Sequence, residues 1–166
     1  ISYTTRKARG NEKNGIDYHF ITNDDFTKLI NSGEMAEYDE YSQGRLYGTL
    51  KQDYKSGNKA VVLTPNGVRQ LKNTCKNDDI FVVLVNANLG TRVKRYIDRC
   101  GVDKFNFDDK NEIAARVERD FGMFLGIENE VDLVVDNSEG VGIKTLTSKI
   151  LLDCIKNRGE NNLCKE

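Results

Sequence analysis

The chain has 166 residues, of which 38% are hydrophobic and 31% charged, and its formal net charge is -1. This length suits one domain with a real core. The near-zero charge argues against a nucleic-acid-binding protein, which would carry a clear basic excess. No apolar run approaches the roughly 18 residues that span a bilayer, so we expect no membrane association. The four cysteines form no Cys-x-x-Cys pair and only one histidine accompanies them, which argues against zinc and favours reduced thiols in the cytoplasm.

The first half of the chain predicts a small α+β region. A helix capped by Asn23 or Asp24 ends at Gly33, and its apolar positions share one face: Phe26, Leu29 and Ile30. Residues 35–41 and 46–49 then alternate as two short strands around a Ser-Gln-Gly-Arg turn. A small helix at about 50–56 ends at Gly57.

The second half predicts strands that alternate with helices. Apolar runs at 59–63, 80–85 and 131–135 are typical of strands buried on both faces of a parallel sheet, and 80–85 is the clearest of them. Helices are expected from Pro65, over 89–100, from about 109 and over 140–155, with Ile113, Val117, Phe121 and Phe124 on one stripe. Residues 101–109 show no apolar periodicity and are predicted to be an excursion from the core. The alternation indicates an α/β domain on a mainly parallel sheet.

The opening stretch is the first candidate for a functional site. Arg6 and Arg9 follow the hydroxyl residues Ser2, Thr4 and Thr5. An arginine presents a planar fork of donors that matches phosphate or carboxylate oxygens two at a time, and hydroxyls add neutral donors to the same anion. Taken alone, however, two arginines are more simply interpreted as a solvated basic loop.

Several blocks in a fixed order decide between these interpretations. The blocks are Ser2-Tyr-Thr-Thr-Arg6-Lys-Ala-Arg9 with Glu12, Gly15, Asp17, Tyr18 and Phe20, then Glu34-Met-Ala-Glu37-Tyr38, then Tyr47-Gly48-Thr49. In this order they resemble the GMP-binding lobe of the guanylate kinase family. The resemblance covers almost the whole chain. It implies a P-loop kinase fold over 1–156, with a GMP-binding lobe at about 18–49, a lid at about 99–116 and a polar tail at 157–166. The implied reaction is transfer of the γ-phosphate of ATP to GMP or dGMP, with Mg²⁺.

The resemblance also assigns roles to particular residues. Those matching the family's clamp on the GMP phosphate are Arg6, Arg9, Tyr18 and Tyr47. Those matching positions that recognise guanine are Ser2, Glu37, Thr49 and, at the end of a strand, Thr64. Glu37 suits its role because guanine offers two adjacent donors, the ring N1–H and the exocyclic amine, to one carboxylate. Without the family match, an exposed strand carboxylate is an equally good interpretation of Glu37, and simple packing a somewhat better one of Tyr47.

The lid and the ATP side match more loosely. The stretch Lys94-Arg95-Tyr-Ile-Asp-Arg99-Cys-Gly101 resembles the helix that leads into the family's lid, and Arg116 resembles an arginine of the returning helix. These three arginines would neutralise charge that develops on the transferred phosphoryl group. For Arg92 and Lys94 a basic solvated helix face is the better interpretation. Val134-Val-Asp136-Asn137 resembles the strand end near the adenine pocket, which makes Asn137 a candidate ATP contact.

The sequence departs from the family pattern in two places. The phosphate-binding loop Gly-x-x-x-x-Gly-Lys-[Ser/Thr] is absent from it. We expect that loop, with its strand and helix, upstream of Ile1, so that phosphoryl transfer by this chain alone is doubtful. The family also usually carries a carboxylate at the Thr64 position. This leaves three alternatives: selectivity for guanine is looser, Asp39 or Glu40 supplies the carboxylate in place of residue 64, or catalysis is weakened.

Three hypotheses therefore stay open. The first is a guanylate kinase acting on GMP or dGMP and ATP, as a monomer or homodimer. The second is an inactive guanylate kinase-like module that binds GMP or phosphopeptides. The third is a nucleoside monophosphate kinase of altered base specificity. The lid arginines favour the two kinases, because a peptide-binding module has no use for a lid.

Overall fold

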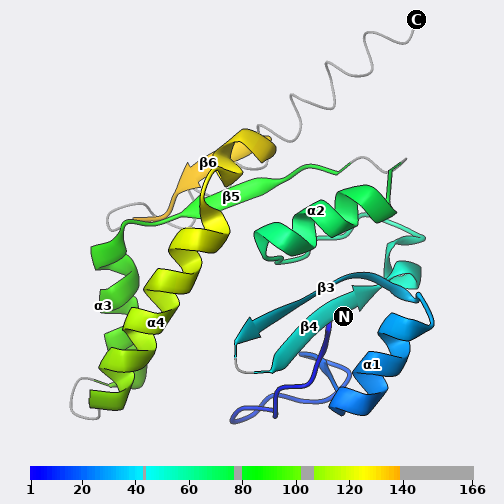
Figure 1. Cartoon of the computed structure of the whole chain (residues 1–166), viewed down its shortest axis with the longest axis horizontal. Coiled ribbons are helices and arrows are strands. Elements are labelled where there is room, and N and C mark those ends of the chain that lie inside the picture. Colours follow the sequence, from blue (N-terminus) through cyan, green and yellow to red (C-terminus); the bar gives the residue numbers. More distant parts are fainter. Residues whose placement is uncertain (43, 77–79, 102–106, 139–166) are drawn as a thin grey trace, which may run out of the picture. The chain divides into compact units, whose positions relative to one another are not determined.

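The computed structural model describes residues 1–42, 44–76, 80–101 and 107–138. The chain forms two compact units, Ile1–Ile80 and Phe81–Glu166. Within the described residues, the first unit contains a mixed sheet with two α-helices, and the second contains a parallel strand pair with two α-helices (Figure 1). The α/β class expected from the sequence is therefore confirmed.

The first unit is built on a four-stranded sheet in the order β2-β1-β4-β3. Its strands are β1 (Tyr3–Thr4), β2 (His19–Phe20), β3 (Met35–Ser42) and β4 (Arg45–Leu50). β1 runs parallel to β2 and antiparallel to β4, and β3 and β4 form an antiparallel hairpin. Gly44 has a φ of 73° in the turn of this hairpin, a conformation that glycine adopts without steric cost. The two strands predicted at 35–41 and 46–49 are thus confirmed.

Helix α1 (Asn23–Asn31) covers one face of this sheet and forms the core. Phe26 is fully buried and packs with Met35 and Leu50, and Leu29 and Ile30 pack against this cluster, as the apolar stripe predicted. The helix cap, however, is Thr22 and neither Asn23 nor Asp24. Its hydroxyl accepts a hydrogen bond from the Asp25 N–H at 3.1 Å and donates to the Asp25 carboxylate at 2.8 Å. Because this reciprocal pair satisfies a free amide of the first turn, the helix begins one residue after the threonine.

Helix α2 (Pro65–Thr74) supplies hydrogen-bond partners to backbone groups of β3, the strand at one edge of the sheet. The Gln70 side chain accepts from the Tyr38 N–H at 3.2 Å and donates to the Tyr38 carbonyl at 2.8 Å, and the Thr74 hydroxyl donates to the carbonyl of Ala36 at 2.8 Å. Side chains therefore replace a further strand along β3 and close an edge that would otherwise be open to pairing. Pro65 occupies the first turn of α2, as predicted, with Thr64 as the cap.

Two predictions on the connection between hairpin and α2 differ from the structure. The small helix is a single 3₁₀ turn, Lys51–Tyr54. Residues 59–63 form no strand, and Val62 is 99% exposed. A strand exists only where a neighbour completes its hydrogen bonds, and within the described residues no strand pairs with 59–63. The apolar composition of this segment was therefore a poor guide to its structure.

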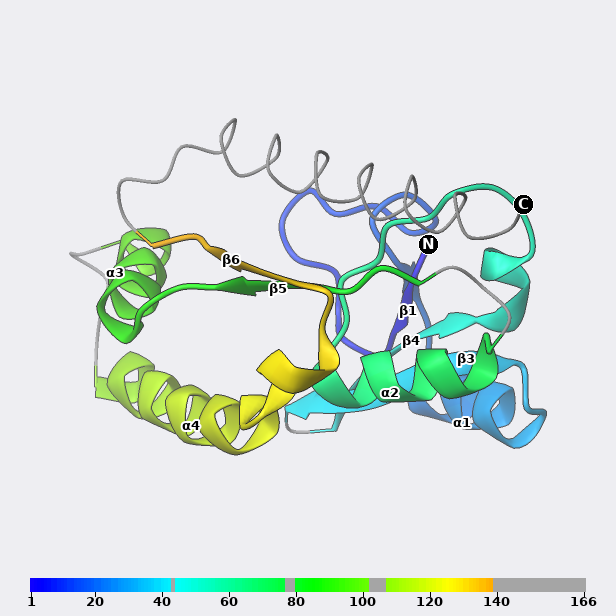
Figure 2. The same cartoon turned by 90° about the horizontal axis from the view of Figure 1, so that it is seen from above.

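In the second unit, β5 (Val83–Asn86) and β6 (Leu133–Asp136) pair in parallel, and they lie side by side in Figures 1 and 2. Both strands start later than predicted. Val135 is 1% exposed, but Val85 is 51% and Val134 43% exposed, so the strands are not buried on both faces. A two-stranded sheet leaves open edges and faces, which explains the exposure of valines that composition alone placed in a core.

Helices α3 (Leu89–Cys100) and α4 (Phe107–Phe124) lie beside each other within the same unit (Figure 2), and a 3₁₀ turn follows at Ile127–Glu130. α4 begins before the predicted position of about 109. Its predicted apolar stripe is only half right, because Ile113 and Val117 are half-buried whereas Phe121 is 74% and Phe124 36% exposed. The centre of the predicted excursion 101–109, the helix at 140–155 and the tail at 157–166 lie outside the described residues. Among the described helices, none has the length and apolar character that a bilayer crossing requires.

Gly48 provides a test of the packing between the sheet and α1. A Cβ at this position would lie 2.7 Å from the Glu37 carbonyl oxygen and 3.2 Å from a ring carbon of Phe26. We expect Gly48→Ala to lower the free energy of unfolding by about 1–3 kcal/mol, because a rigid backbone oxygen has no room to move away. Denaturant unfolding measures this change. The matched control is Gly122→Ala in α4, where a Cβ meets nothing within 4 Å and helix propensity favours alanine. Equal effects of the two substitutions would contradict the packing argument.

Candidate functional site

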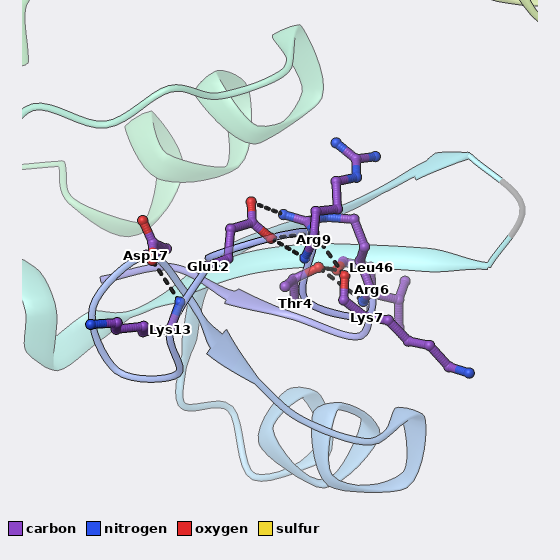
Figure 3. Close-up of polar contacts among 8 residues, drawn as sticks. All are labelled: Thr4, Arg6, Lys7, Arg9, Glu12, Lys13, Asp17 and Leu46. Atoms are coloured by element: carbon purple, nitrogen blue, oxygen red, sulfur yellow. Dashed lines mark hydrogen bonds and ion pairs between the residues drawn. The ribbon is translucent and has the colours of Figure 1, made fainter. Parts of the chain in front are cut away.

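The opening loop is organised by an ion pair between Arg6 and Glu12 (Figure 3). The two terminal nitrogens of the Arg6 guanidinium donate to the two carboxylate oxygens of Glu12 at 2.7 and 2.9 Å. One of these oxygens also accepts from the backbone N–H of Arg9 at 2.7 Å. Arg6 donates in addition to the carbonyl of Lys7 at 2.7 Å. Glu12 therefore holds the side chain of one arginine and the backbone of the other.

Aromatic rings surround the Arg6 guanidinium. Its central carbon lies 5.3 Å from the centre of the Tyr18 ring and 5.6 Å from that of Phe20. Tyr18 in turn meets Tyr47 edge-on, with 6.1 Å between ring centres. Arg6 is only 8% exposed, and its Nε is buried with no hydrogen-bond partner among the described residues. A rigid, buried guanidinium thus keeps one donor unused.

Arg9 behaves differently from Arg6. Its side chain is exposed, and its guanidinium extends away from the Glu12 contact (Figure 3). The structure therefore brings Arg6, Tyr18 and Tyr47 together from the predicted phosphate clamp, and places Arg9 beside them through its backbone bond to Glu12. The exposed guanidinium of Arg9 can therefore rotate toward an anion that binds at this loop.

The ion pair changes the proton affinity of both partners. The bond from Arg6, and after it the backbone bond from Arg9, lowers the pKa of Glu12 from 4.5 to about 2. The bond to Glu12, followed by a smaller contribution from Tyr47, raises the pKa of Arg6. Both groups are charged throughout the neutral range, so the loop carries a fixed cation at Arg6.

A second polar group lies on the hairpin. Glu37 is 4% exposed, and its carboxylate accepts a hydrogen bond from the Thr49 hydroxyl at 2.7 Å. The Thr49 hydroxyl oxygen also lies 2.7 Å from the Tyr54 hydroxyl. Burial raises the pKa of Glu37, the bonds from Thr49 oppose this shift, and the charge of Asp39 adds to it. A buried carboxylate with so few donors is ready to accept bonds from a ligand.

Thr64 links strand β3 to the start of α2 through two hydrogen bonds. Its hydroxyl donates to the carboxylate of Asp39, while its oxygen accepts from the Gly67 N–H at 3.1 Å and so caps the helix. Asn66 Nδ2 donates to the same Asp39 carboxylate at 3.3 Å. A Cβ on Gly67 would come within 3.0 Å of a Glu37 carboxylate oxygen. Both carboxylates therefore face the N-terminal end of α2, where the helix dipole favours negative charge.

The strand register puts these groups on one face of the sheet. Glu37 lies opposite Thr49, and Asp39 lies opposite Tyr47. Because side chains alternate between the two faces of a strand, all four share the face opposite to the Phe26 core. On β1, Thr4 lies opposite Tyr47, which puts Ser2 on the same side by alternation. Ser2 is half-buried, and its carbonyl accepts from the His19 N–H at 2.9 Å.

The predicted lid arginines lie in the second unit. Arg99 of α3 and Arg116 of α4 each place their guanidinium carbon 5.3 Å from the centre of the Tyr96 ring. Arg116 also pairs with Glu112 at 2.6 Å. Glu112 accepts from the Tyr96 hydroxyl at 3.0 Å, and burial, followed by this bond, raises the pKa of Tyr96 to about 12. Two of the three predicted arginines are thus gathered around one tyrosine.

The remaining predictions for this unit are simpler. Arg95 is exposed on α3, one turn before Arg99. Arg92 lies 3.7 Å from the Asp120 carboxylate of α4, so it links the two helices and is not only a solvated surface charge. Asn137 follows β6, and its N–H donates to the Asn86 carbonyl at 2.6 Å at the end of the parallel pair.

No group of three or more His, Cys, Asp or Glu side chains in the described parts of the chain could hold a metal ion. Magnesium in phosphate-transfer sites is held by one or two carboxylates together with substrate phosphates and water, so its binding does not require such a protein cluster.

Three contacts of the candidate site were not predicted from the sequence. Glu12 was noted as part of a motif, but its bond to Arg6 was not predicted, although an acidic residue six positions after an arginine in a glycine-rich loop is a usable signal. Tyr54 joins Thr49 through the turn that follows β4. The bond between Asp39 and Thr64 spans 25 residues and has no local signal in the sequence.

Comparisons with known proteins agree on one family. The family model described as guanylate kinase matches residues 1–140. A guanylate kinase of Enterococcus faecalis is 31% identical over 149 residues, covering 85% of this chain and 72% of that protein. One of Malacoplasma penetrans is 31% identical over 145 residues, covering 84% and 70%. The crystal structure of guanylate kinase from Anaplasma phagocytophilum is 21% identical, with a TM-score of 0.61 over 93% of this chain and 73% of that one, which bears on the fold.

The Arg6–Glu12 pair gives a pH-dependent test. The pKa of Glu12 is lowered in the folded chain, so its ionised form stabilises the fold above its ordinary pKa of 4.5, and this contribution is lost as the pH falls toward about 2. We expect wild type to melt at a higher temperature than Glu12→Gln at pH 7, with the difference shrinking between pH 4.5 and 2. Thermal unfolding across this range measures it. Glu34→Gln is the control, because its carboxylate accepts from the neutral hydroxyl of Ser32 at 2.6 Å. A difference that stays constant down to pH 2 would refute the assignment.

Proposed function

The chain belongs to the guanylate kinase family, and we propose that it binds GMP or dGMP as the acceptor in transfer of the γ-phosphate of ATP, a reaction that yields GDP or dGDP. Family membership makes it a nucleoside monophosphate kinase, that is, a nucleotide-binding transferase. GMP as acceptor, ATP as donor and the roles of individual residues are parts of the proposal.

One observation supports it most strongly. Tyr47 and Thr49 lie two residues apart on the same face of β4, with the Arg6 cluster beside the first and the Glu37 carboxylate beside the second. Two residues of strand span about 6.6–6.8 Å. A cationic, hydroxyl-bearing end and an anionic end are therefore fixed side by side. A guanine nucleotide has the complementary arrangement, an anionic phosphate at one end and a base edge rich in donors at the other.

The cationic end would bind the acceptor phosphate. Arg6 is held by Glu12 and offers its unused Nε, Arg9 supplies a second, adjustable fork, and the Tyr18 and Tyr47 hydroxyls add neutral donors. One free charged fork at Arg9, the charged N–H of Arg6 and two neutral hydroxyls suit the several oxygens of a dianionic monophosphate. Fixing the phosphate before the reaction aligns its oxygen with the incoming phosphoryl group and removes the entropic cost of that alignment.

The anionic end would recognise the base. Glu37 accepts the guanine N1–H and one hydrogen of the exocyclic amine, and Thr49 holds the carboxylate in position. Ser2 lies on the same side of the sheet and completes the set that the family pattern assigns to the base. A buried carboxylate that gains two donors loses much of its desolvation penalty, which favours guanine over bases without that pair of donors.

Residues of the second unit would bind ATP, the phosphoryl donor, and assist the transfer. Arg95, Arg99 and Arg116 would stabilise the charge that develops on the transferred group, and Asn137 would contact ATP. Magnesium would arrive with ATP, whose phosphates it binds. Cys75 and Cys100 are present as thiols, in keeping with a cytoplasmic location.

Arg6→Ala tests the phosphate clamp. We expect it to weaken GMP binding by about 2–5 kcal/mol, because it removes a buried charged donor and leaves Glu12 without its cationic partner. Calorimetric titration of the 166-residue chain with GMP measures the loss. Lys7→Ala is the matched control: Lys7 is a cation of the same loop whose side chain extends away from that of Arg9 (Figure 3). Unchanged affinity in Arg6→Ala, or an equal loss in both variants, would remove Arg6 from the clamp.

A further inference from the structure

Asp39 is a second carboxylate on the sheet face that carries Glu37. It follows Glu37 by two residues on β3, so both carboxylates project from the same face of the strand. Asp39 is half-buried, whereas Glu37 is almost completely buried. Glu40, the next residue, points to the other face and is exposed, and its carboxylate accepts from the Gly44 N–H at 2.7 Å in the hairpin turn. Asp39 is therefore the carboxylate that accompanies Glu37.

The contacts of Asp39 fix its orientation without saturating it. One carboxylate oxygen accepts from the Thr64 hydroxyl. The other accepts from Asn66 Nδ2 at 3.3 Å and from the Glu40 N–H at 3.0 Å. An ionised carboxylate offers about four acceptor positions, so three donors leave one available. That position belongs to the oxygen bonded to Thr64.

Thr64 acts as the anchor of this carboxylate. Its oxygen accepts from the Gly67 N–H, so its single hydroxyl hydrogen is directed to Asp39. An acidic residue at position 64 would place a second negative charge against Asp39, and like charges at this separation repel. A neutral hydroxyl at position 64 and a carboxylate at position 39 therefore form a mutually compatible pair.

The chemistry of guanine requires a second acceptor. Its Watson–Crick edge presents the ring N1–H and an exocyclic amine with two hydrogens. Glu37 has two oxygens, which match N1–H and the nearer amine hydrogen. The farther amine hydrogen needs another acceptor, and leaving it unpaired in a buried site would weaken binding. The neighbouring carboxylate on the same strand face is the group available for it.

We propose that Asp39, anchored by Thr64, accepts the second hydrogen of the guanine exocyclic amine and thereby sets the preference of this chain for GMP over IMP. The inference rests on the proposed function, because it presumes that the base lies against Glu37. IMP retains the N1–H and the ring carbonyl of GMP and lacks only the exocyclic amine. IMP therefore lacks both amine contacts, the one to Glu37 and the one to Asp39, and the change of the GMP-to-IMP affinity ratio in an Asp39 variant isolates the contact made by Asp39.

The experiment is calorimetric titration of the 166-residue chain with GMP and with IMP. Wild type is expected to bind GMP at least about tenfold more tightly, as the loss of hydrogen bonds to charged groups implies. Asp39→Ala should lower GMP affinity about tenfold and leave IMP affinity unchanged, so that the GMP-to-IMP affinity ratio falls about tenfold. Glu40→Ala, the matched control on the opposite strand face, should retain the preference. Asp39→Asn, which keeps the size of the side chain and a neutral acceptor for Thr64, serves if Asp39→Ala proves unstable: it should lower GMP affinity selectively but by less, because a neutral oxygen accepts a weaker hydrogen bond than a carboxylate.

The outcomes separate the two levels of the proposal. A GMP-to-IMP ratio that is unchanged in the Asp39 variants, or an equal loss for both nucleotides, overturns the role of Asp39 and leaves GMP binding intact. A loss of preference in Glu40→Ala alone transfers the role to that residue and also overturns the inference. If wild type binds neither nucleotide, the proposed function itself fails, and the inference fails with it.

Discussion

The register of the β3–β4 hairpin is the constraint on which the site depends. It sets Glu37 opposite Thr49 and Asp39 opposite Tyr47, while the alternate positions Leu46 and Leu50 pack toward Phe26. A slip by one residue would exchange the two faces, burying the carboxylates against α1 and exposing the core leucines. The cost of that exchange is hydrophobic, so the same packing that stabilises the unit also orients its polar face. Register shifts occur between Met35 and Glu37 and between Glu40 and Ser42, which leaves the central pairs undisturbed.

Charge is distributed along this face in a way that limits its cost. The cation at Arg6 is neutralised by Glu12 and stacked among aromatic rings, whereas the carboxylates Glu37 and Asp39 meet threonine hydroxyls and the N-terminal end of α2. Neither end relies on the other for partners. The groups are therefore ordered before a ligand arrives, and a ligand of opposite polarity at its two ends gains contacts without a large cost of rearrangement.

The two units contribute different chemistry. The first contains the Arg6–Glu12 ion pair with its aromatic rings and the carboxylates Glu37 and Asp39. The second contains the arginines gathered around Tyr96, where Glu112 satisfies both Arg116 and the tyrosine hydroxyl. In the second unit the arginines are held by an aromatic ring and one carboxylate on a pair of helices. In the first unit Arg6 is held by a bidentate carboxylate in a loop. Each unit thus positions its own cations by local contacts.

Local patterns were sufficient to predict much of the fold. The stripe of Phe26, Leu29 and Ile30 predicted α1 and the side that it buries, because helix periodicity is encoded in neighbouring residues. The resemblance to the guanylate kinase family pointed to Arg6, Tyr18 and Tyr47, which the structure brings together, and to Glu37, which shares a sheet face with Tyr47. The helix cap at Thr22 was missed by one residue, since several adjacent side chains are competent caps and the reciprocal bond with Asp25 decides among them.

Burial and contacts that involve residues distant in the chain were determined only by the tertiary structure. Residues 59–63 and Val62 look like a buried strand by composition, yet burial requires a neighbour that the sequence pattern does not specify. Thr64 looks like a lost carboxylate, and only the approach of β3 to the end of α2 shows Asp39 bonded to it. The sequence by itself determined which residue types are available and which faces are apolar. The fold decided which of them meet, because contacts across tens of residues follow from strand pairing and helix packing and leave no mark in local periodicity.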